Sequence, residues 1–163
     1  MCIRDSACIV GEPTNPDYLG QMIKIGRRGS FTGWLTVTGV QGHTAYPHLA
    51  ENPLSKLVKM LEPLAEEQLD QGTEYFPPTT AAISSIDTGN SASNVIPQKV
   101  TASFNIRFND SRTAEDIEKW LRAHFDSVGA NYMLETACSS NAFITEPGAL
   151  SDDLVSAVKA VVG

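Results

Sequence analysis

The chain has 163 residues, a length that suits a single domain with a sizeable buried core. Hydrophobic residues make up 42% of the chain and charged residues 19%, which is ordinary for a globular protein. The net charge of -7 and the pI near 4.8 argue against nucleic acid or an anionic membrane as a partner, because both bind basic patches. No stretch approaches the roughly 18 consecutive apolar residues that a membrane-spanning helix requires.

Cysteine use and the first residues bear on the cellular compartment. Cys2, Cys8 and Cys138 include no C-x-x-C pair, so neither a disulfide framework nor a thiolate zinc site is indicated. Residues 1–6 have no apolar segment behind a basic start, so they are not predicted to be a signal peptide. These observations predict a cytoplasmic protein, since reducing conditions suit unpaired cysteines.

Three strands are predicted near the start of the chain. Ala7–Val10 is a short apolar run, and Met22–Ile25 is predicted to be a second strand. Gly26–Gly29 has the composition of a tight turn. From Ser30 to Thr38 apolar and polar residues alternate, and this period of two predicts a strand with one buried face.

A helix is predicted to begin after Asn52, which can act as N-cap for a helix with Pro53 at its first position. Apolar residues recur at helical spacing over Leu54–Ala65 and form one stripe. Pro63 lies inside this stripe and is predicted to kink or split the helix near Leu61.

Two strands and a polar loop are predicted to follow. Thr80–Ile86 is the first strand, Thr88–Gln98 the loop, and Lys99–Phe108 the most regular alternation in the chain. Asn105 and Arg107 lie two residues apart on the polar face of this last strand, so they stand side by side. They become binding groups if a ligand or another domain covers that face.

A second helix is predicted to begin at Thr113, with Asp116 placed for a capping-box arrangement. Tyr132–Thr136 is predicted to be a strand, and a final helix is predicted to begin near Ser151. From Met22 onward the order is β, β, α, β, β, α, β, α. We therefore predict an α+β fold in which two helices pack on one face of an antiparallel sheet.

The segment Gly39–Pro53 carries the strongest functional signal. Gly39 and Gly42 lack side chains, so the backbone can turn sharply there and a partner can come close to His43. A histidine held in such a turn can donate a hydrogen bond to negative charge that develops on a substrate. The alternative is a loop histidine with only a local hydrogen bond.

Two metal sites can be considered. A site of His43, His48 and Glu51 is disfavoured, because the histidines are five residues apart with a proline between them, unlike the i, i+4 pair of helical zinc motifs. Glu12 is the better candidate, since it follows a predicted strand that would hold its side chain rigidly. A solvated turn carboxylate is the alternative for Glu12.

Other polar residues are candidates for substrate binding. Arg27 and Arg28 can hold a substrate carboxylate through bidentate hydrogen bonds, or they form a basic hairpin tip. Asn94 either forms a turn or directs its amide at a ligand.

Several segments together resemble the M20 metallopeptidase family, in matching order and with natural spacing. They are GRRGS, GVQGHTAYPHLA, SNVIP and FNIRF. The resemblance runs from about Ala7 to the C-terminus. It implies a ferredoxin-like dimerisation domain flanked by pieces of an α/β catalytic domain, and a dizinc amidohydrolase in which cobalt can replace zinc.

The resemblance also implies a reaction and roles for single residues. The GHxAYPH block is typical of family members that hydrolyse N-succinyl-LL-2,6-diaminopimelate to succinate and LL-2,6-diaminopimelate, a step of bacterial lysine and diaminopimelate biosynthesis. Glu12 matches a carboxylate that binds one zinc. His43 matches a histidine that reaches across a homodimer and polarises the scissile carbonyl in the neighbouring active site. The residues that match positions holding the substrate's carboxylates and amide are Arg27, Tyr46, Asn94 and Arg107.

The resemblance divides the chain into three parts. Residues 1–21 are a remnant of the catalytic domain, residues 22–137 the lid and dimerisation domain, and residues 138–163 the start of a return into the catalytic domain. Residues 1–6 do not resemble the family's lead-in and are predicted to be foreign to it. The family's other zinc ligands and its general base have no matching residues here. The chain is therefore expected to be an internal fragment that is inactive alone.

Alternatives remain for the parent protein. An acetylornithine deacetylase-like or aminoacylase-like hydrolase is the next candidate, because no single residue here encodes the acyl group of the substrate. A non-catalytic α+β oligomerisation module is the alternative from a different functional class.

Overall fold

The computed structural model describes residues 7–11, 15–66 and 68–162. The chain forms two compact units, one of residues 26–144 and one of residues 1–25 together with 145–163. No helix in the described part of the chain is long and apolar enough to cross a membrane.

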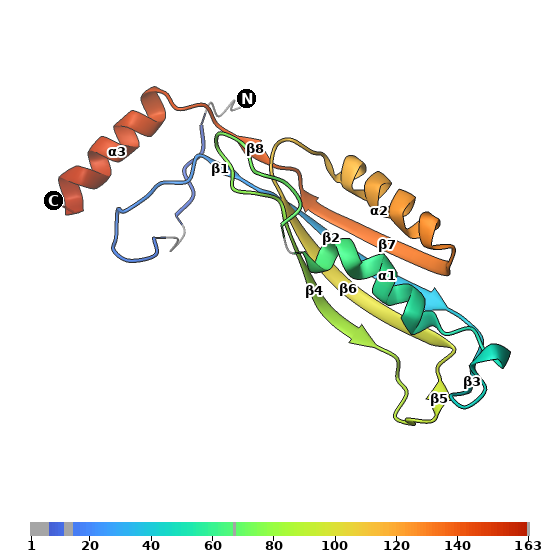
Figure 1. Ribbon diagram of the computed structural model, residues 1–163. Coiled ribbons are helices and arrows are strands. Elements are labelled where there is room, and N and C mark those ends of the chain that lie inside the picture. Colours follow the sequence, from blue (N-terminus) through green and yellow to red (C-terminus); the bar gives the residue numbers. More distant parts are fainter. Residues whose placement is uncertain (1–6, 12–14, 67, 163) are drawn as a thin grey trace, which may run out of the picture. The chain divides into compact units, whose positions relative to one another are not determined.

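The larger unit is built on an antiparallel four-stranded sheet with the strand order β4-β6-β2-β7. Its helices α1 and α2 lie on the same face of the sheet (Figure 1). The chain order β2-α1-β4-β6-α2-β7 with this sheet order is ferredoxin-like, which confirms the predicted α+β fold with two helices on one face. The elements are β2 (Gly29–Thr38), α1 (Pro53–Ala65), β4 (Thr80–Asp87), β6 (Lys99–Phe108), α2 (Ala114–Val128) and β7 (Asn131–Ser140).

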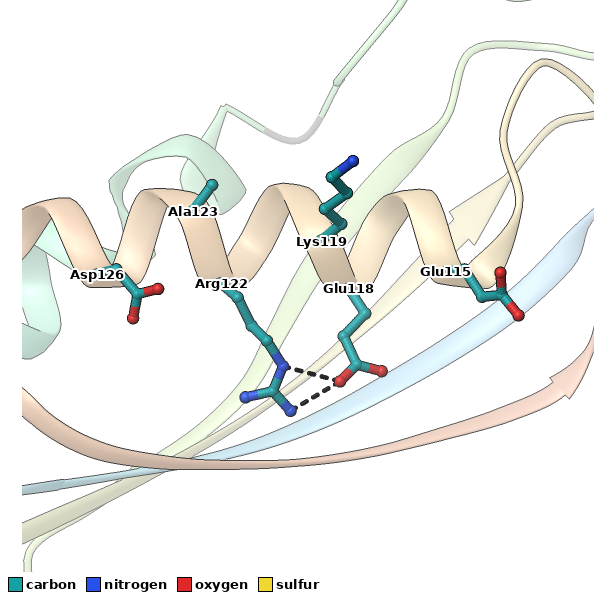
Figure 2. A pocket seen from close by; sticks show the side chains of 6 residues that line it. All are labelled: Glu115, Glu118, Lys119, Arg122, Ala123 and Asp126. Atoms are coloured by element: carbon teal, nitrogen blue, oxygen red, sulfur yellow. Dashed lines mark hydrogen bonds and ion pairs between the residues drawn. The ribbon is translucent and has the colours of Figure 1, made fainter.

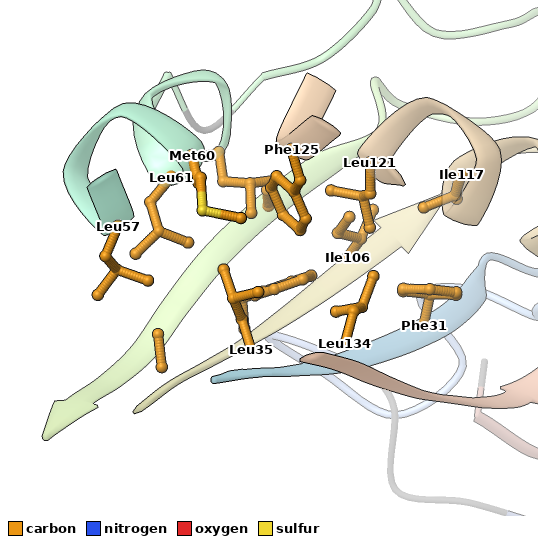
Figure 3. Packing of buried hydrophobic residues seen from close by; sticks show 14 of the residues in the cluster. Phe31, Leu35, Leu57, Met60, Leu61, Ile106, Ile117, Leu121, Phe125 and Leu134 are labelled. Atoms are coloured by element: carbon orange, nitrogen blue, oxygen red, sulfur yellow. The ribbon is translucent and has the colours of Figure 1, made fainter. Parts of the chain in front are cut away.

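The ladder between β2 and β6 is the longest among the described residues. It pairs all ten residues of each strand without a register shift, from Gly29 with Phe108 to Thr38 with Lys99. Alternate residues of β6 are buried under the helices, as the sequence predicted, and Asn105 and Arg107 lie on the helix-free face. Figure 3 shows the apolar side chains of α1 and α2 meeting those of the sheet. The largest fully buried side chains include Phe31, Leu35, Met60, Phe104, Phe108 and Phe125.

Gly26 and Gly29 do not form the predicted tight turn. Gly26–Arg27 is a short strand, β1, which pairs with β8 (Phe143–Ile144), and β2 begins at Gly29. A Cβ on Gly26 would lie 2.6 Å from the Phe143 carbonyl oxygen, and one on Gly29 would lie 2.1 Å from the Phe108 ring. The glycines are therefore needed for close packing across the sheet rather than for chain reversal.

The predicted strands Ala7–Val10 and Met22–Ile25 are also wrong, because residues 7–11 and 22–25 are not in strands. Ile9 and Val10 are 62% and 72% exposed. A strand requires hydrogen bonds from a neighbour, and no described strand pairs with either segment. Helix α3 (Ala149–Val162) begins two residues before the predicted cap, Ser151.

Helix α1 begins as predicted, since the Asn52 side chain accepts a hydrogen bond from the Leu54 N–H at 3.0 Å. The helix does not split at Pro63 but continues to Ala65. Proline has no N–H to bond the carbonyl of Lys59, four residues earlier. That carbonyl oxygen instead lies 3.1 Å from Nε2 of His124 on α2, so this nitrogen must donate a proton to it. An interhelical bond thus replaces the missing helical one.

Helix α2 has the predicted capping box. The Thr113 hydroxyl accepts from the Asp116 N–H, and the Asp116 carboxylate accepts from the Thr113 N–H. The N–H and the hydroxyl of Thr113 both donate to the Asp116 carboxylate, and these bonds lower its pKa. The helix ends at Gly129, whose φ of 65° is left-handed and favours glycine.

The bond between His124 and Lys59 predicts a thermodynamic coupling between two positions far apart in sequence. His124→Ala leaves the Lys59 carbonyl without a donor and should lower the free energy of unfolding by about 1 kcal/mol. In a Pro63→Ala background the backbone N–H at position 63 satisfies that carbonyl, so the cost of His124→Ala should fall by roughly half or more. Urea denaturation of the four proteins measures the coupling. Strictly additive effects would contradict this account of Pro63.

Candidate active site

Two short strands build a projection beyond the far end of β2, which we call the tip (residues 39–51 and 94–96). Strand β3 (Gly42–His43) pairs with β5 (Val95–Ile96), and the Thr44 N–H donates to the Asn94 carbonyl at 3.0 Å. The prediction of a polar loop over residues 88–98 is therefore wrong at β5. Because of this pairing, His43 and Asn94 lie together although they are 51 residues apart in sequence.

The two glycines before His43, Gly39 and Gly42, allow the start of the tip to pack closely against its residues 50 and 51. A Cβ on Gly39 would lie 2.1 Å from the Glu51 carbonyl oxygen, and one on Gly42 would lie 2.6 Å from the Ala50 Cβ. Val40 and Glu51 exchange two backbone hydrogen bonds of 2.9 Å across the same narrow gap. Neither glycine has a positive φ, so close approach rather than an unusual turn requires them.

The ring of His43 is oriented by a backbone N–H group two residues further along the chain. Its Nδ1 accepts a hydrogen bond from the Ala45 N–H at 3.0 Å. In the neutral ring the proton must then be on Nε2. The side chain is exposed, and Nε2 has no partner among the described residues. His43 therefore offers a free N–H donor to the surroundings of the tip.

The Tyr46 ring lies between those of the two histidines of the tip, as a neighbour of each. The Tyr46 ring centroid lies 6.0 Å from that of His43 and 6.3 Å from that of His48. The residues of the disfavoured zinc site do not gather around a common point, and Glu51 faces Val40 through its backbone. Within the described ranges, no group of three or more His, Cys, Asp or Glu side chains could hold a metal ion. Glu12, the predicted ligand, lies outside the described residues.

The two arginines predicted to bind substrate lie at the opposite end of the sheet, which we call the base (Arg27, Arg28, Thr80 and Arg107). The side chains of Arg27 and Arg107 are exposed, and neither side chain has a hydrogen bond or ion pair in the described part of the chain. Arg28, in contrast, donates to the Pro78 carbonyl at 3.2 Å and to the Thr80 hydroxyl at 3.3 Å. Of the Arg-Arg pair, Arg28 thus anchors the start of β4, and Arg27 remains available to a ligand.

Asn105 stands beside Arg107 on the helix-free face, but its amide N–H groups are already used. They donate to the Thr32 hydroxyl at 2.9 Å and to the Ser30 hydroxyl at 3.4 Å, both on β2. Its carbonyl oxygen therefore points away from β2, toward an open hollow beside β4 that Arg107 also lines. The sequence placed Asn105 on the correct face but did not reveal these bonds.

The tip and the base are too far apart to form one site within a single chain. Arg107 is paired with Ser30 near the start of β2, and the tip begins at Gly39, nine residues later. At about 3.3 Å per residue, the two ends are about 30 Å apart along the strand. His43, Tyr46 and Asn94 thus form one cluster, and Arg27 and Arg107 lie in another.

Residues 25–133 match the family described as the peptidase dimerisation domain of M20 proteins. The chain belongs to this family. The match includes the whole of β2, β4 and β6 with both covering helices, so it accounts for most of the larger unit described above.

Relatives of known name agree with this assignment. The succinyl-diaminopimelate desuccinylase of Rhodospirillum centenum is 56% identical over 98% of this chain and 42% of the relative. That of Parvibaculum lavamentivorans is 51% identical over 96% of this chain and 40% of the relative. The chain therefore spans about two fifths of the length of the curated relatives it matches.

Solved structures support the fold. An M20 family metallo-carboxypeptidase from Sulfolobus solfataricus superposes with a TM-score of 0.68 over 85% of this chain and 50% of that chain, at 12% sequence identity. This likeness concerns the fold alone, since the sequences have diverged.

The backbone contact of His43 predicts its tautomer. In the M20 dimerisation domain at about pH 8, where imidazoles are mainly neutral, nitrogen NMR should show His43 protonated at Nε2. His48 is an internal control, because its ring nitrogens have no hydrogen-bond partner within the described residues. A His43 ring protonated mainly at Nδ1 would show that the Ala45 contact does not hold in solution.

Proposed function

We propose that this chain supplies the lid and dimerisation part, residues 22–137, of an enzyme that hydrolyses N-succinyl-LL-2,6-diaminopimelate to succinate and LL-2,6-diaminopimelate. The names of relatives that are 51% and 56% identical support this substrate over an acetylornithine deacetylase-like or aminoacylase-like parent. The names of these relatives also disfavour a non-catalytic α+β oligomerisation module. The 163-residue chain alone should be inactive, because it spans about two fifths of these relatives.

The observation that carries the proposal is the free Nε2–H of His43. In amide hydrolysis the carbonyl oxygen gains negative charge as the carbonyl carbon becomes tetrahedral. A neutral imidazole whose Nδ1 is held by the Ala45 N–H presents its other nitrogen as a fixed donor to that oxygen. We therefore assign His43 the role of stabilising the oxyanion.

The separation of the tip from the base supports a homodimer as the active form. Arg27 and Arg107 at the base would hold substrate carboxylates of one subunit's site, and Tyr46 and Asn94 would reach the same substrate from the tip of the other subunit. A single chain cannot bring these residues together, because about 30 Å of strand separates them. In a two-fold dimer, each tip can serve the site of its partner.

The described residues do not themselves form a metal site, so no step is assigned to a metal here. We propose that the whole enzyme holds two zinc ions, which cobalt can replace, through Glu12 and residues outside this chain. The M20 metallo-carboxypeptidase with the same fold supports a metal cofactor. We also propose a cytoplasmic location, in line with three cysteines that include no C-x-x-C pair.

The role of His43 can be tested in a chimeric enzyme in which this chain replaces the matching segment of the Rhodospirillum centenum desuccinylase. His43→Ala should lower kcat by roughly 100- to 1,000-fold with little change in KM, because the hydrogen bond strengthens only in the transition state. His48→Ala, a change of the same kind in the same tip, should leave kcat within a few-fold of the parent. An unchanged kcat in the His43 variant would refute the assignment.

Arg107 should respond differently in the same chimera. A carboxylate clamp binds substrate and transition state alike, so Arg107→Ala should raise KM on the order of tenfold or more and change kcat less. Arg107→Lys keeps the charge but loses the bidentate geometry, and it should recover only part of the affinity. A lowered kcat with an unchanged KM would place Arg107 outside the carboxylate subsite.

A further inference from the structure

The strand pair that carries His43 is short, since β3 and β5 contribute two residues each. The Thr44 N–H donates to the Asn94 carbonyl, so the backbone N–H and C=O of Val95, the residue opposite His43, face away from β3. Isolated two-stranded pairs are at best marginally stable in water. A ladder of this length therefore needs support from outside.

The Asn90 side chain supplies such support on the far side of β5. Its amide nitrogen donates to the Val95 carbonyl at 2.9 Å and to the Ala92 carbonyl at 3.2 Å, and its oxygen accepts from the Ala92 N–H at 3.0 Å. The Val95 N–H also donates to the Ala92 carbonyl, at 3.5 Å. Both outward backbone groups of Val95 are thus bonded within the loop, one of them directly by Asn90.

The bond to Val95 distinguishes Asn90 from an ordinary turn asparagine. An asparagine that only shapes its own turn bonds the backbone two residues further on, as Asn90 does with Ala92. The bond to Val95 reaches beyond that turn, into the strand that pairs with His43. Asn90 therefore connects the loop after β4 to the tip.

Asn90 is itself held near the end of the sheet. Its N–H donates to the Thr88 hydroxyl at 3.1 Å, and the Gly89 N–H donates to the Asp87 carboxylate at 2.8 Å. The Thr101 hydroxyl on β6 donates to the Asp87 carbonyl at 3.2 Å. The loop is thus bonded to β6 at one end and to β5 at the other.

We propose that Asn90 is a positioning residue that acts through Val95 to hold His43 and Asn94 in place for the neighbouring active site, a role that rests on the part played by the tip in the proposed function. Asn90 does not bind the substrate itself, because its oxygen and its amide nitrogen are bonded within the loop. A donor to the developing oxyanion has to be held close to its productive position, since a misplacement of about 1 Å can lower the rate by about 100-fold.

Amide hydrogen exchange in the 163-residue chain tests whether Asn90 holds the tip. Asn90→Ala removes the side-chain bonds to Val95 and Ala92, so the Thr44 amide should exchange on the order of tenfold faster. Asn90→Asp keeps an oxygen for the Ala92 N–H but cannot donate to Val95, so Thr44 should exchange at least as fast as in Asn90→Ala. Amides of β6 should stay protected in every variant, which shows that the chain remains folded.

Two further variants serve as controls. Ser91→Ala changes the next side chain of the same loop, which has no hydrogen bond among the described residues. Glu118→Ala breaks the ion pair with Arg122 that Figure 2 shows on α2, a helix that contributes no residue to the tip. Both should leave the exchange of the Thr44 amide near that of the wild-type chain. Exchange in Asn90→Ala that is no faster than in these controls would overturn the proposal.

A double-mutant cycle in the chimeric enzyme separates positioning from a general structural effect. Asn90→Ala should lower kcat on the order of tenfold when His43 is present. In the His43→Ala background the same change should cost less than about twofold, because no donor is left to misplace. Equal losses in the two backgrounds would contradict an action through His43.

The outcomes distinguish the role of Asn90 from the proposed function. If His43→Ala lowers kcat and Asn90→Ala does not, the positioning role is refuted and the proposed function stands. If His43→Ala leaves kcat unchanged, the proposed role of His43 fails and the positioning role fails with it, whatever the exchange of the Thr44 amide.

Discussion

The antiparallel ladder between β2 and β6 is the constraint on which the rest of the structure depends. Its ten pairs run without a shift, so the buried face of one strand stays aligned with that of the other over the full length. The helices α1 and α2 can then cover a single apolar surface. The same rigid length separates the His43 tip from the Arg107 base. The fold thus places the two halves of the proposed site at opposite ends of one sheet.

Features set by neighbouring residues could be predicted from the sequence. The alternation in Lys99–Phe108 specified a strand and its buried face, and Asn52 and Thr113 marked the starts of α1 and α2. These signals are local, because a cap or a period of two depends only on residues a few positions away. The α+β arrangement, with two helices on one face of an antiparallel sheet, followed from the order of such elements.

Features that depend on distant contacts could not be predicted. The glycines at 26 and 29 suggested a turn, but their partners are Phe143 and Phe108, far along the chain. Pro63 suggested a broken helix, because nothing near it shows that His124 supplies the missing donor. Strand β5 has two residues and no pattern of its own, so only its pairing with β3 defines it. The local candidates for the site were visible in the sequence, whereas their division between two ends was not.

That division is the central claim about the molecule, and mixing two defective enzymes tests it most directly. In the chimera, subunits carrying His43→Ala are mixed and exchanged with subunits carrying Arg107→Ala. If the tip of one chain serves the base of the other, each mixed dimer has one site with both groups intact, and about one quarter of the wild-type sites should be recovered at equal mixing. If both groups act within one chain, every site keeps a defect. Activity that stays at the level of the separate variants, despite proven subunit exchange, would contradict the account.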